Sequence, residues 1–201
     1  MQIVNRLEFQ TRQELRNWLK DNHGISTQAW IPVLSKNPDE LSYLAIVEEC
    51  LCFGWIDSTK KRLGRSSSGE PFDHTTGTND VMYQRISPRR KSGNWTELNK
   101  ERVRRLASLG LMYPQGEKVL PDMDIANFTI RQDVMNAIKA DPVIYDNFTK
   151  LPPLYIRIRI DNIQGYPEGD DTYNRRLEKF LINTKESKLY GDWNDGGRLL
   201  Q

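Results

Sequence analysis

The chain has 201 residues, of which 37% are hydrophobic and 28% are charged, and its formal net charge is only +2. This length suits one sizeable hydrophobic core better than two, because domains usually run to about 100–200 residues. No apolar run approaches the ~20 residues that span a bilayer. Asn5, Arg6 and Glu8 interrupt the N-terminal stretch where a secretory signal would be apolar. We therefore expect one cytoplasmic domain without membrane insertion.

Two helices are predicted in the first quarter of the chain. Residues Thr11 to Glu14 have the pattern of a capping box, in which the first and last side chains each accept a hydrogen bond from the other residue's backbone amide. The helix that this box starts should end near Gly24. Between residues 42 and 53 apolar side chains fall on almost every face of a helix. That pattern is typical of a helix buried on most sides.

Four segments are strand candidates and should form a small antiparallel sheet. They cover residues 3–9, 29–34, 55–62 and 81–87. The second is a short apolar, β-branched run, and Pro32 places it at a sheet edge because proline cannot donate to the ladder. The stretch from Lys60 to Asp80 is rich in Ser, Gly, Thr and Asp, which predicts a surface loop.

The second half of the chain predicts further helices. Thr96 is a suitable N-cap and Gly110 a suitable end for one of them. Three more are expected at residues 130–140, 142–150 and 172–184. Between the last two, apolar and polar residues alternate strictly from Leu154 to Asp161, a period that by itself is typical of a strand.

Cysteine and histidine usage indicates neither a metal site nor a cofactor. Cys50 and Cys52 lie two residues apart in the predicted buried helix, where such positions point to nearly opposite faces. We expect two buried free thiols, since a lone C-x-C lacks the further ligands that zinc needs. His23 and His74 are the only histidines, so a histidine-based triad or metal cluster is not predicted. No glycine-rich phosphate motif is present either.

Positive charge is concentrated in residues 85–105. This segment holds eight basic residues against two glutamates, a net charge of +6, which leaves −4 for the rest of the chain. The basic residues are Arg85, Arg89, Arg90, Lys91, Lys100, Arg102, Arg104 and Arg105. Such a concentration creates a local field that favours anions. The alternative is a solvated helix face with arginines that pair with Glu48, Glu49 or Asp57, and both interpretations stay open.

The residues around this segment suit an anion site. Arg89 and Arg90 can each grip a carboxylate or a phosphate bidentately. Ser92 can add a neutral hydrogen bond and Trp95 a stacking face. The amides that open the following helix also attract anions.

Two motifs, and the C-terminal third, resemble a known bacterial family. Phe53 to Asp57 reads FGWID, and Pro88 to Trp95 reads PRRKSGNW, which has the form PRR-x-S-x-NW. These motifs are similar to those of the YdeI/OmpD-associated, or bacteriocin-protection, family. The resemblance implies a helical C-terminal region, so we expect residues 154–163 to be helical despite their alternation. It also implies a part in bacterial tolerance of bacteriocins or cationic antimicrobial peptides, without a defined reaction.

These expectations give an α+β fold as a single domain over residues 1–201, with a small antiparallel sheet and a majority of α-helices. We expect an α+β lobe at 1–125, an all-helical lobe at 126–190 and a tail at 191–201. The sequence does not indicate an oligomeric state.

Our leading hypothesis is a stress-tolerance protein in which the two motifs meet at one anion-binding cleft. Arg89 and Arg90 would clamp the ligand, Ser92 and Asn99 would hydrogen-bond to it, and Asp57 would orient an arginine. Trp55 and Trp95 would form the walls of this cleft. The candidate ligand-binding residues, which also include one further arginine of the basic segment, are Arg85, Arg89, Arg90, Ser92, Trp55, Asp57, Trp95 and Asn99.

Three alternatives stand beside this hypothesis. The first is an enzyme in which Asp57 is a general base for a phosphorylated or carboxylated substrate. The second is a protein that binds single-stranded nucleic acid along residues 85–105, although broad nucleic-acid binding is not expected at a net charge of +2. The third is a purely structural pairing of the two motifs. We favour binding over catalysis, with a small anionic ligand as the expected partner.

Overall fold

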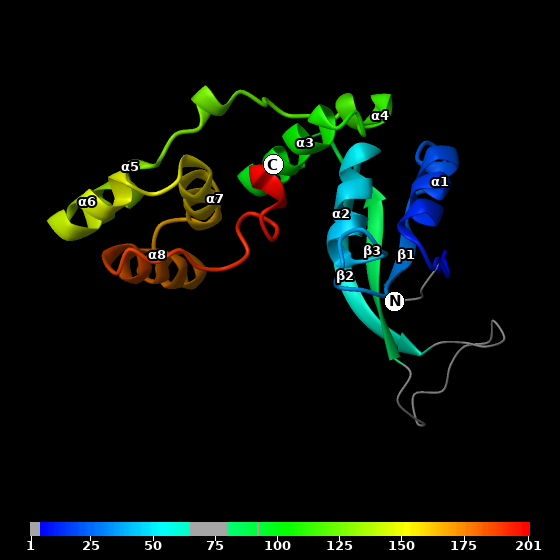
Figure 1. The fold of residues 1–201 in the computed structure, drawn as a ribbon, viewed down its shortest axis with the longest axis horizontal. Coiled ribbons are helices and arrows are strands. Elements are labelled where there is room, and N and C mark those ends of the chain that lie inside the picture. Colours follow the sequence, from blue (N-terminus) through cyan, green and yellow to red (C-terminus); the bar gives the residue numbers. More distant parts are fainter. Residues whose placement is uncertain (1–4, 65–79, 92) are drawn as a thin grey trace. The chain divides into compact units, whose positions relative to one another are not determined.

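The structure is a computed structural model that describes residues 5–64, 80–91 and 93–201. The chain divides into two compact units, unit 1 (Met1–Gly93 and Leu106–Pro121) and unit 2 (Asn94–Arg105 and Asp122–Gln201). In the described residues the fold is α+β, with eight α-helices and one antiparallel three-stranded sheet, as predicted (Figure 1). Most of the predicted loop from Lys60 to Asp80 lies outside the described residues, and so does Ser92.

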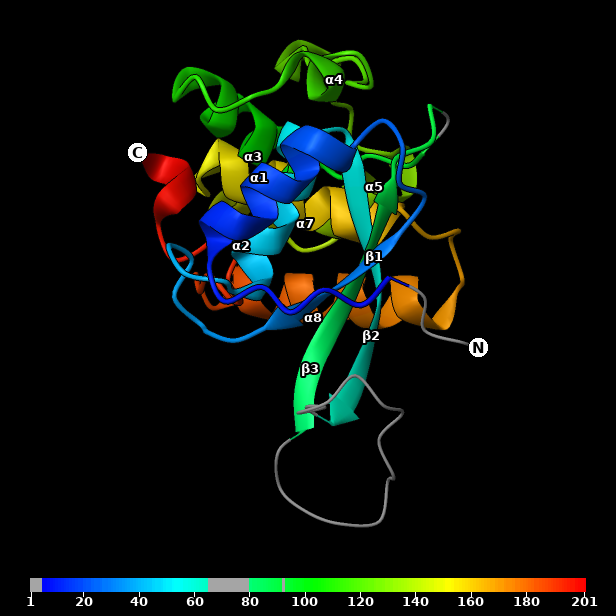
Figure 2. The same cartoon turned by 90° about the vertical axis from the view of Figure 1, so that its right-hand side faces the viewer.

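Unit 1 holds the sheet and the first helices. Its elements are α1 (Arg12–Asn22), β1 (Ala29–Val33), α2 (Tyr43–Cys52), β2 (Trp55–Gly64), β3 (Asp80–Pro88), the last residues of α3 (Glu97–Ser108) and α4 (Pro114–Glu117). The strand order is β1-β3-β2, and β3 pairs antiparallel with both neighbours. Figure 2 shows β2 and β3 running together as a long ribbon. The sheet edge at β1 contains Pro32, which confirms the edge-strand prediction.

Local signals in the sequence form the first two helices as expected. The Thr11 hydroxyl accepts from the Glu14 amide at 3.2 Å and the Glu14 carboxylate accepts from the Thr11 amide at 2.9 Å, so the capping box is complete. Gly54 ends α2 in the left-handed region, with φ +71°, and turns the chain directly into β2. A Cβ at that position would lie 3.0 Å from the Gln115 carbonyl oxygen, so only glycine fits there without strain.

The prediction of a strand at residues 3–9 is wrong for the described residues of that segment. They contribute only an isolated bridge between Arg6 and Trp30. Asn5 has a positive φ of 62°, which breaks an extended strand. Two backbone hydrogen bonds with Trp30, both of 3.0 Å, hold Asn5 and Leu7, and Glu8 accepts a hydrogen bond from the Tyr83 hydroxyl at 2.7 Å.

A buried ion network joins α1 to α2 inside unit 1. Glu48 and Glu49, the two charged residues of α2, are each 1% exposed. Arg12 binds Glu48 at 2.8 Å and Glu49 at 2.7 Å, and Arg16 binds Glu49 at 2.8 Å. The arginines that hold these glutamates therefore come from α1 rather than from the PRR motif. Cys50 and Cys52 of the same helix are free and buried, as predicted.

Unit 2 is helical. It contains the first residues of α3 together with α5 (Gln132–Lys139), α6 (Pro142–Thr149), α7 (Pro153–Gln164), α8 (Asp171–Lys185) and two short 3₁₀ turns, Ile125–Asn127 and Arg198–Leu200. Its core includes Tyr155, Phe180, Trp193 and Leu199, so the predicted tail at 191–201 belongs to this unit. The division near residue 121 lies close to the predicted change of lobe at 125.

The helix predicted at 154–163 is confirmed as α7, and its packing explains the strand-like alternation. Tyr155, Ile158, Ile160 and Ile163 are all buried, so apolar positions surround most of the helix instead of one stripe. Within the described residues no helix is long and apolar enough to cross a membrane.

Candidate anion-binding site

Part of the predicted site lies in unit 1, where β2 and β3 meet α2. Asp57 pairs with Ile86 across the sheet, and its Oδ2 accepts from the Tyr43 hydroxyl at 2.8 Å. The ammonium group of Lys60 lies 3.7 Å from the centroid of the Tyr43 ring. Arg89 follows β3 directly, and its backbone amide donates to the Gly54 carbonyl at 2.9 Å. The FGWID and PRR motifs are therefore joined through the backbone.

Arg89 and Arg90 have different surroundings. Arg89 is only 6% exposed, whereas Arg90 is exposed. Burial lowers the pKa of Arg89, and the negative charge of Asp57 acts in the opposite direction. The negative charge of Asp57 therefore favours the charged form of Arg89. The role of Asp57 in orienting an arginine stays a prediction. The different exposure of the two arginines does not favour a symmetric clamp.

Two other predicted ligand residues of unit 1 serve the fold. Trp55 is 1% exposed, its indole donates to the His23 carbonyl at 3.2 Å, and its ring meets that of Trp18 edge-on at 5.7 Å. Trp55 is therefore a core residue, which corrects its assignment as a ligand wall. Arg85 donates to the side-chain oxygen of Gln28 at 2.8 Å.

Of the remaining predicted residues, Trp95 and Asn99 lie in unit 2. Ser92 lies outside the described residues. Trp95 is half-buried just before α3. The Asn99 side-chain oxygen accepts from Arg102 at 2.9 Å, and Arg102 binds both carboxylate oxygens of Asp195 at 2.7 and 2.8 Å. Asn99 thus supports an intramolecular ion pair.

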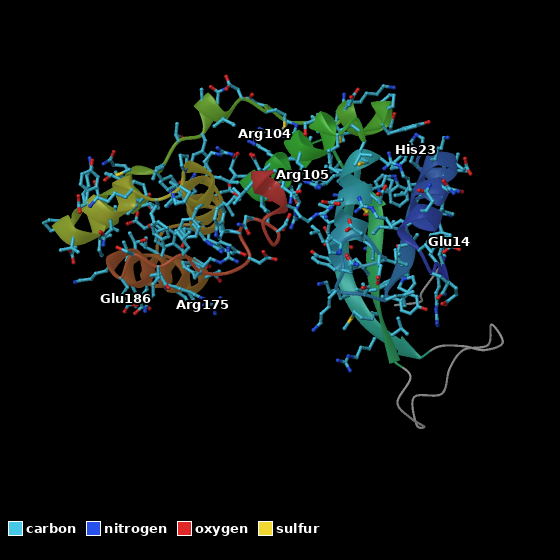
Figure 3. All side chains as sticks on the ribbon, viewed as in Figure 1. Glu14, His23, Arg104, Arg105, Arg175 and Glu186 are labelled. Carbon is cyan, nitrogen blue, oxygen red and sulfur yellow. The ribbon has the colours of Figure 1, made fainter. Side chains whose placement is uncertain are left out.

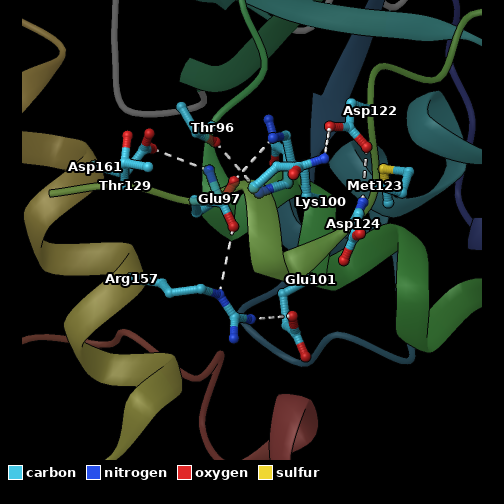
Figure 4. Close-up of polar contacts among 12 residues, drawn as sticks. Thr96, Glu97, Lys100, Glu101, Asp122, Met123, Asp124, Thr129, Arg157 and Asp161 are labelled. Atoms are coloured by element: carbon cyan, nitrogen blue, oxygen red, sulfur yellow. Dashed lines mark hydrogen bonds and ion pairs between the residues drawn. The ribbon is translucent and has the colours of Figure 1, made fainter.

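Much of the +6 charge of residues 85–105 is compensated within the chain. Lys100 pairs with Glu97 at 2.9 Å, and Arg104 pairs with Glu101 at 2.7 Å. The same two glutamates also receive Arg157 of α7, at 3.4 and 2.7 Å (Figure 4). These contacts, with the Arg102 and Asp195 pair, leave a weaker field at this segment than its sequence suggests. They favour the structural interpretation of the segment over a nucleic-acid surface.

A different cluster of cations lies in unit 2, where α7 meets α8. These residues surround a cavity of about 350 Å³, which we call the basic pocket. Its lining is Arg159, Asn162, Ile163, Arg175, Arg176, Lys179 and Tyr190. Four of these seven side chains are cations, and none is a carboxylate. The volume lies within the range of about 300–1,000 Å³ that is usual for small-molecule sites.

Neutral groups hold the cations of the basic pocket in place. Arg159 donates to the Tyr190 carbonyl and lies 4.4 Å from the centroid of the Tyr190 ring. Arg176 donates to the Asn162 carbonyl at 2.5 Å and lies 4.8 Å from the centroid of the Tyr166 ring. Lys179 lies 4.9 Å from the centroid of the Tyr190 ring. Because carbonyls and aromatic rings carry no net charge, these contacts fix the cations without cancelling their charge.

Gly191 allows the chain after α8 to close on Arg159. Its φ is +67°, and a Cβ there would lie 2.6 Å from Arg159 Nη2. A side chain at this position would both strain the backbone and displace the guanidinium. Glycine at 191 is therefore a condition for the observed position of Arg159.

The sequence signal for the basic pocket is a group of basic residues on α8, which lies outside the basic segment at residues 85–105. Arg175, Arg176 and Lys179 fall close together in the sequence of α8. Figure 3 labels Arg175 on this helix. Arg175 and Lys179 are four residues apart and exposed, and like charges at that spacing destabilise a helix by about 0.2–0.5 kcal/mol. No described acidic side chain forms an ion pair with either. Within the described residues these two cations therefore keep their charge without an acidic partner.

A second cavity, of about 470 Å³, adjoins the basic pocket and shares two of its residues, Asn162 and Arg176. We call it the polar pocket. Its lining is Asn94, Thr96, Asp161, Asn162, Gln164, Gly165, Tyr166 and Arg176. Burial raises the pKa of Asp161, although the Glu97 amide donates to its Oδ2 at 2.9 Å and acts the other way. In the described part of the chain no group of three or more His, Cys, Asp or Glu side chains is placed to hold a metal ion.

Comparison with known proteins gives one match. The model of the family described as "Domain of unknown function (DUF8412)" matches residues 7–119, more than half of the chain. No curated protein and no solved structure matches. The basic pocket lies C-terminal to the matched residues.

Proposed function

The chain belongs to this family of unknown function, and we propose that it binds a small anion through a phosphate or carboxylate group in the basic pocket. The observation that carries the proposal is the lining of that pocket, which has four cations and no carboxylate. Such a lining is costly without a counter-ion, because the like charges repel one another. A bound anion would relieve this repulsion.

The chemistry of the lining supports phosphate or carboxylate recognition. Guanidinium groups bind the oxygens of both anions bidentately, and such charge-assisted hydrogen bonds are roughly twice as strong as neutral ones. Arg159 and Arg176 are already held by neutral partners, so little side-chain freedom is lost when an anion binds. Arg175 and Lys179 are exposed and can close on the ligand from the solvent side.

We propose binding rather than catalysis. Of the residue types that act as general bases or nucleophiles, the lining of the basic pocket contains only Lys179 and Tyr190, and burial raises the pKa of the Tyr190 hydroxyl. The resemblance to the YdeI/OmpD-associated family supplies the setting of the proposal, a cytoplasmic protein with a part in bacterial tolerance of bacteriocins or cationic antimicrobial peptides. Anion binding is the biochemical activity that we propose for it.

Inorganic phosphate, added at constant ionic strength, tests the proposal through the melting temperature. A ligand that binds only the native state stabilises it by about 2.7 kcal/mol at a hundredfold excess over Kd, which is roughly 5–11 °C for a chain of this length. The test variant is Arg175→Gln/Lys179→Gln, which removes two exposed cations of the pocket. The matched control is Lys185→Gln, which removes a cation of α8 outside the pocket.

We expect phosphate to raise the melting temperature of the parent and of Lys185→Gln, and to have little effect on the double variant. The double variant without phosphate should be no less stable than the parent, because the substitutions remove a like-charge pair. Equal phosphate effects in all three proteins would contradict the proposal. A phosphate effect that is lost in Arg90→Gln instead would place the anion at the predicted Arg89 and Arg90 site.

A further inference from the structure

We propose that the ligand is a phosphate ester of a hydroxyl-rich compound, a sugar or polyol phosphate, with its phosphate in the basic pocket and its hydroxyl groups in the polar pocket. This inference rests on the proposed anion binding and adds the chemical class of the ligand. Asn162 and Arg176 line both pockets, so a single small molecule can occupy the two together.

The polar pocket presents the groups that hydroxyls need. The side-chain amide of Asn162 makes no hydrogen bond to any described residue, so its donors and its acceptor are available. The Thr96 hydroxyl accepts from the Asn99 amide at 3.2 Å and keeps its own proton for donation. One oxygen of Asp161 accepts from the Glu97 amide, and within the described chain the other has no donor. A hydroxyl both donates and accepts, which matches this mixed set.

The polar pocket has one carboxylate, Asp161, beside one cation, Arg176, so it has no excess positive charge for a second anionic group. A carboxylate accepts hydrogen bonds from hydroxyls but repels a second phosphate or a carboxylate. The basic pocket next to it has the opposite preference, because its four charged side chains are cations. The two pockets together therefore fit a ligand that is anionic at one end and neutral and hydroxylated at the other.

The aromatic residues of the site argue against a nucleotide base. Only two aromatic side chains line the two pockets, Tyr166 and Tyr190. The Tyr166 ring already lies against Arg176, at 4.8 Å, and the Tyr190 ring lies against Arg159, at 4.4 Å. Both rings already lie against a cation, which leaves less aromatic surface on which a base could stack.

Isothermal titration calorimetry at constant ionic strength with four probes tests this inference. The probes are inorganic phosphate, glucose 6-phosphate, glucose and adenosine monophosphate. We expect glucose 6-phosphate to bind about tenfold more tightly than phosphate, which corresponds to one or two added hydrogen bonds. Glucose alone should show no measurable binding, and adenosine monophosphate should bind no more tightly than phosphate.

The variant Thr96→Val/Tyr166→Phe removes two hydroxyl groups of the polar pocket at residues that do not line the basic pocket, and it keeps every cation. It should bind phosphate as the parent does and lose the added affinity for glucose 6-phosphate. The single variant Tyr166→Phe decides the same point if the double variant does not fold, because phenylalanine keeps the ring that lies against Arg176.

The outcomes separate this inference from the proposed function. Phosphate binding without any gain for glucose 6-phosphate would overturn the inference and leave anion binding in place. Tighter binding of adenosine monophosphate than of glucose 6-phosphate, or survival of the gain in the variants, would overturn the inference in the same way. Absence of binding for both phosphate and glucose 6-phosphate would overturn the proposed function itself.

Discussion

Replacement of Arg12 by methionine should destabilise unit 1 strongly, because it removes one cation from two buried carboxylates. The Arg12 guanidinium lies 2.8 Å from Glu48 and 2.7 Å from Glu49, and those side chains are only 1% and 2% exposed. Burial alone would lower the pKa of Arg12, but the attraction of Glu49 and Glu48 outweighs it and raises the pKa. The Arg12 guanidinium therefore holds its proton more tightly in the folded chain than in the unfolded chain.

The expected magnitude follows from the partners that remain. Loss of one member of a buried ion pair costs about 3–5 kcal/mol. Because Arg16, which lies 2.8 Å from Glu49, still compensates that carboxylate in the variant, we expect a loss of unfolding free energy at the lower end of this range, ~3 kcal/mol. For a chain of this length, a loss of that size lowers the melting temperature by roughly 6–12 °C. Methionine is a good helix former, so the loss is not one of helix propensity.

Urea unfolding followed by tryptophan fluorescence measures the loss. The matched control is Arg90→Met, which makes the same chemical change at an exposed arginine and should cost no more than about 0.5 kcal/mol. Neutralisation of one carboxylate in Arg12→Met/Glu48→Gln should restore part of the lost stability. Equal stabilities of Arg12→Met and Arg90→Met, or no recovery in the double variant, would refute the reasoning.

Three shorter predictions concern other parts of the chain. Gly191→Ala should abolish the phosphate effect on the melting temperature, because the new Cβ would displace Arg159. The variant should also be about 1–2 kcal/mol less stable than the parent, because residue 191 has a positive φ. Unchanged phosphate binding would contradict this prediction. Burial raises the pKa of Cys52 to about 12 and that of Cys50 well above its usual value. Iodoacetamide should therefore modify both thiols only after unfolding, and rapid reaction of the native protein would count against their burial. Burial raises the pKa of Asp161 in the folded state. The parent should therefore lose stability relative to Asp161→Asn as the pH rises from the pKa of this carboxyl in the unfolded chain through its pKa in the folded chain. A difference in unfolding free energy between the two proteins that does not change with pH would contradict this prediction.

Local signals in the sequence predicted the elements that depend on neighbours along the chain. The capping box from Thr11 to Glu14 starts α1, and Pro32 marks an edge strand. The strand at 3–9 failed because its outcome depends on Asn5 adopting a positive φ and on Glu8 binding Tyr83, which lies 75 residues away. The helical state of residues 154–163 came from the family resemblance, since their periodicity indicates a strand.

The candidate site was harder to predict, because the effect of a charge depends on its partners. Arg102 and Arg104 contribute to a strongly basic segment in the sequence, but Asp195 and Glu101 neutralise them in the structure. Asp195 lies 93 residues from Arg102, so no local pattern reveals this pair. The basic pocket draws its cations from two helices, and Arg159 depends on the approach of Gly191 from a third segment.

A crystal structure of the protein grown with inorganic phosphate tests the central claim most directly. We predict phosphate density in the basic pocket, within hydrogen-bond distance of the guanidinium groups of Arg159 and Arg176 and close to Lys179. The same crystals of Arg175→Gln/Lys179→Gln should show water at that position. A phosphate bound at Arg89 or Arg90 while the basic pocket holds only water would contradict the account.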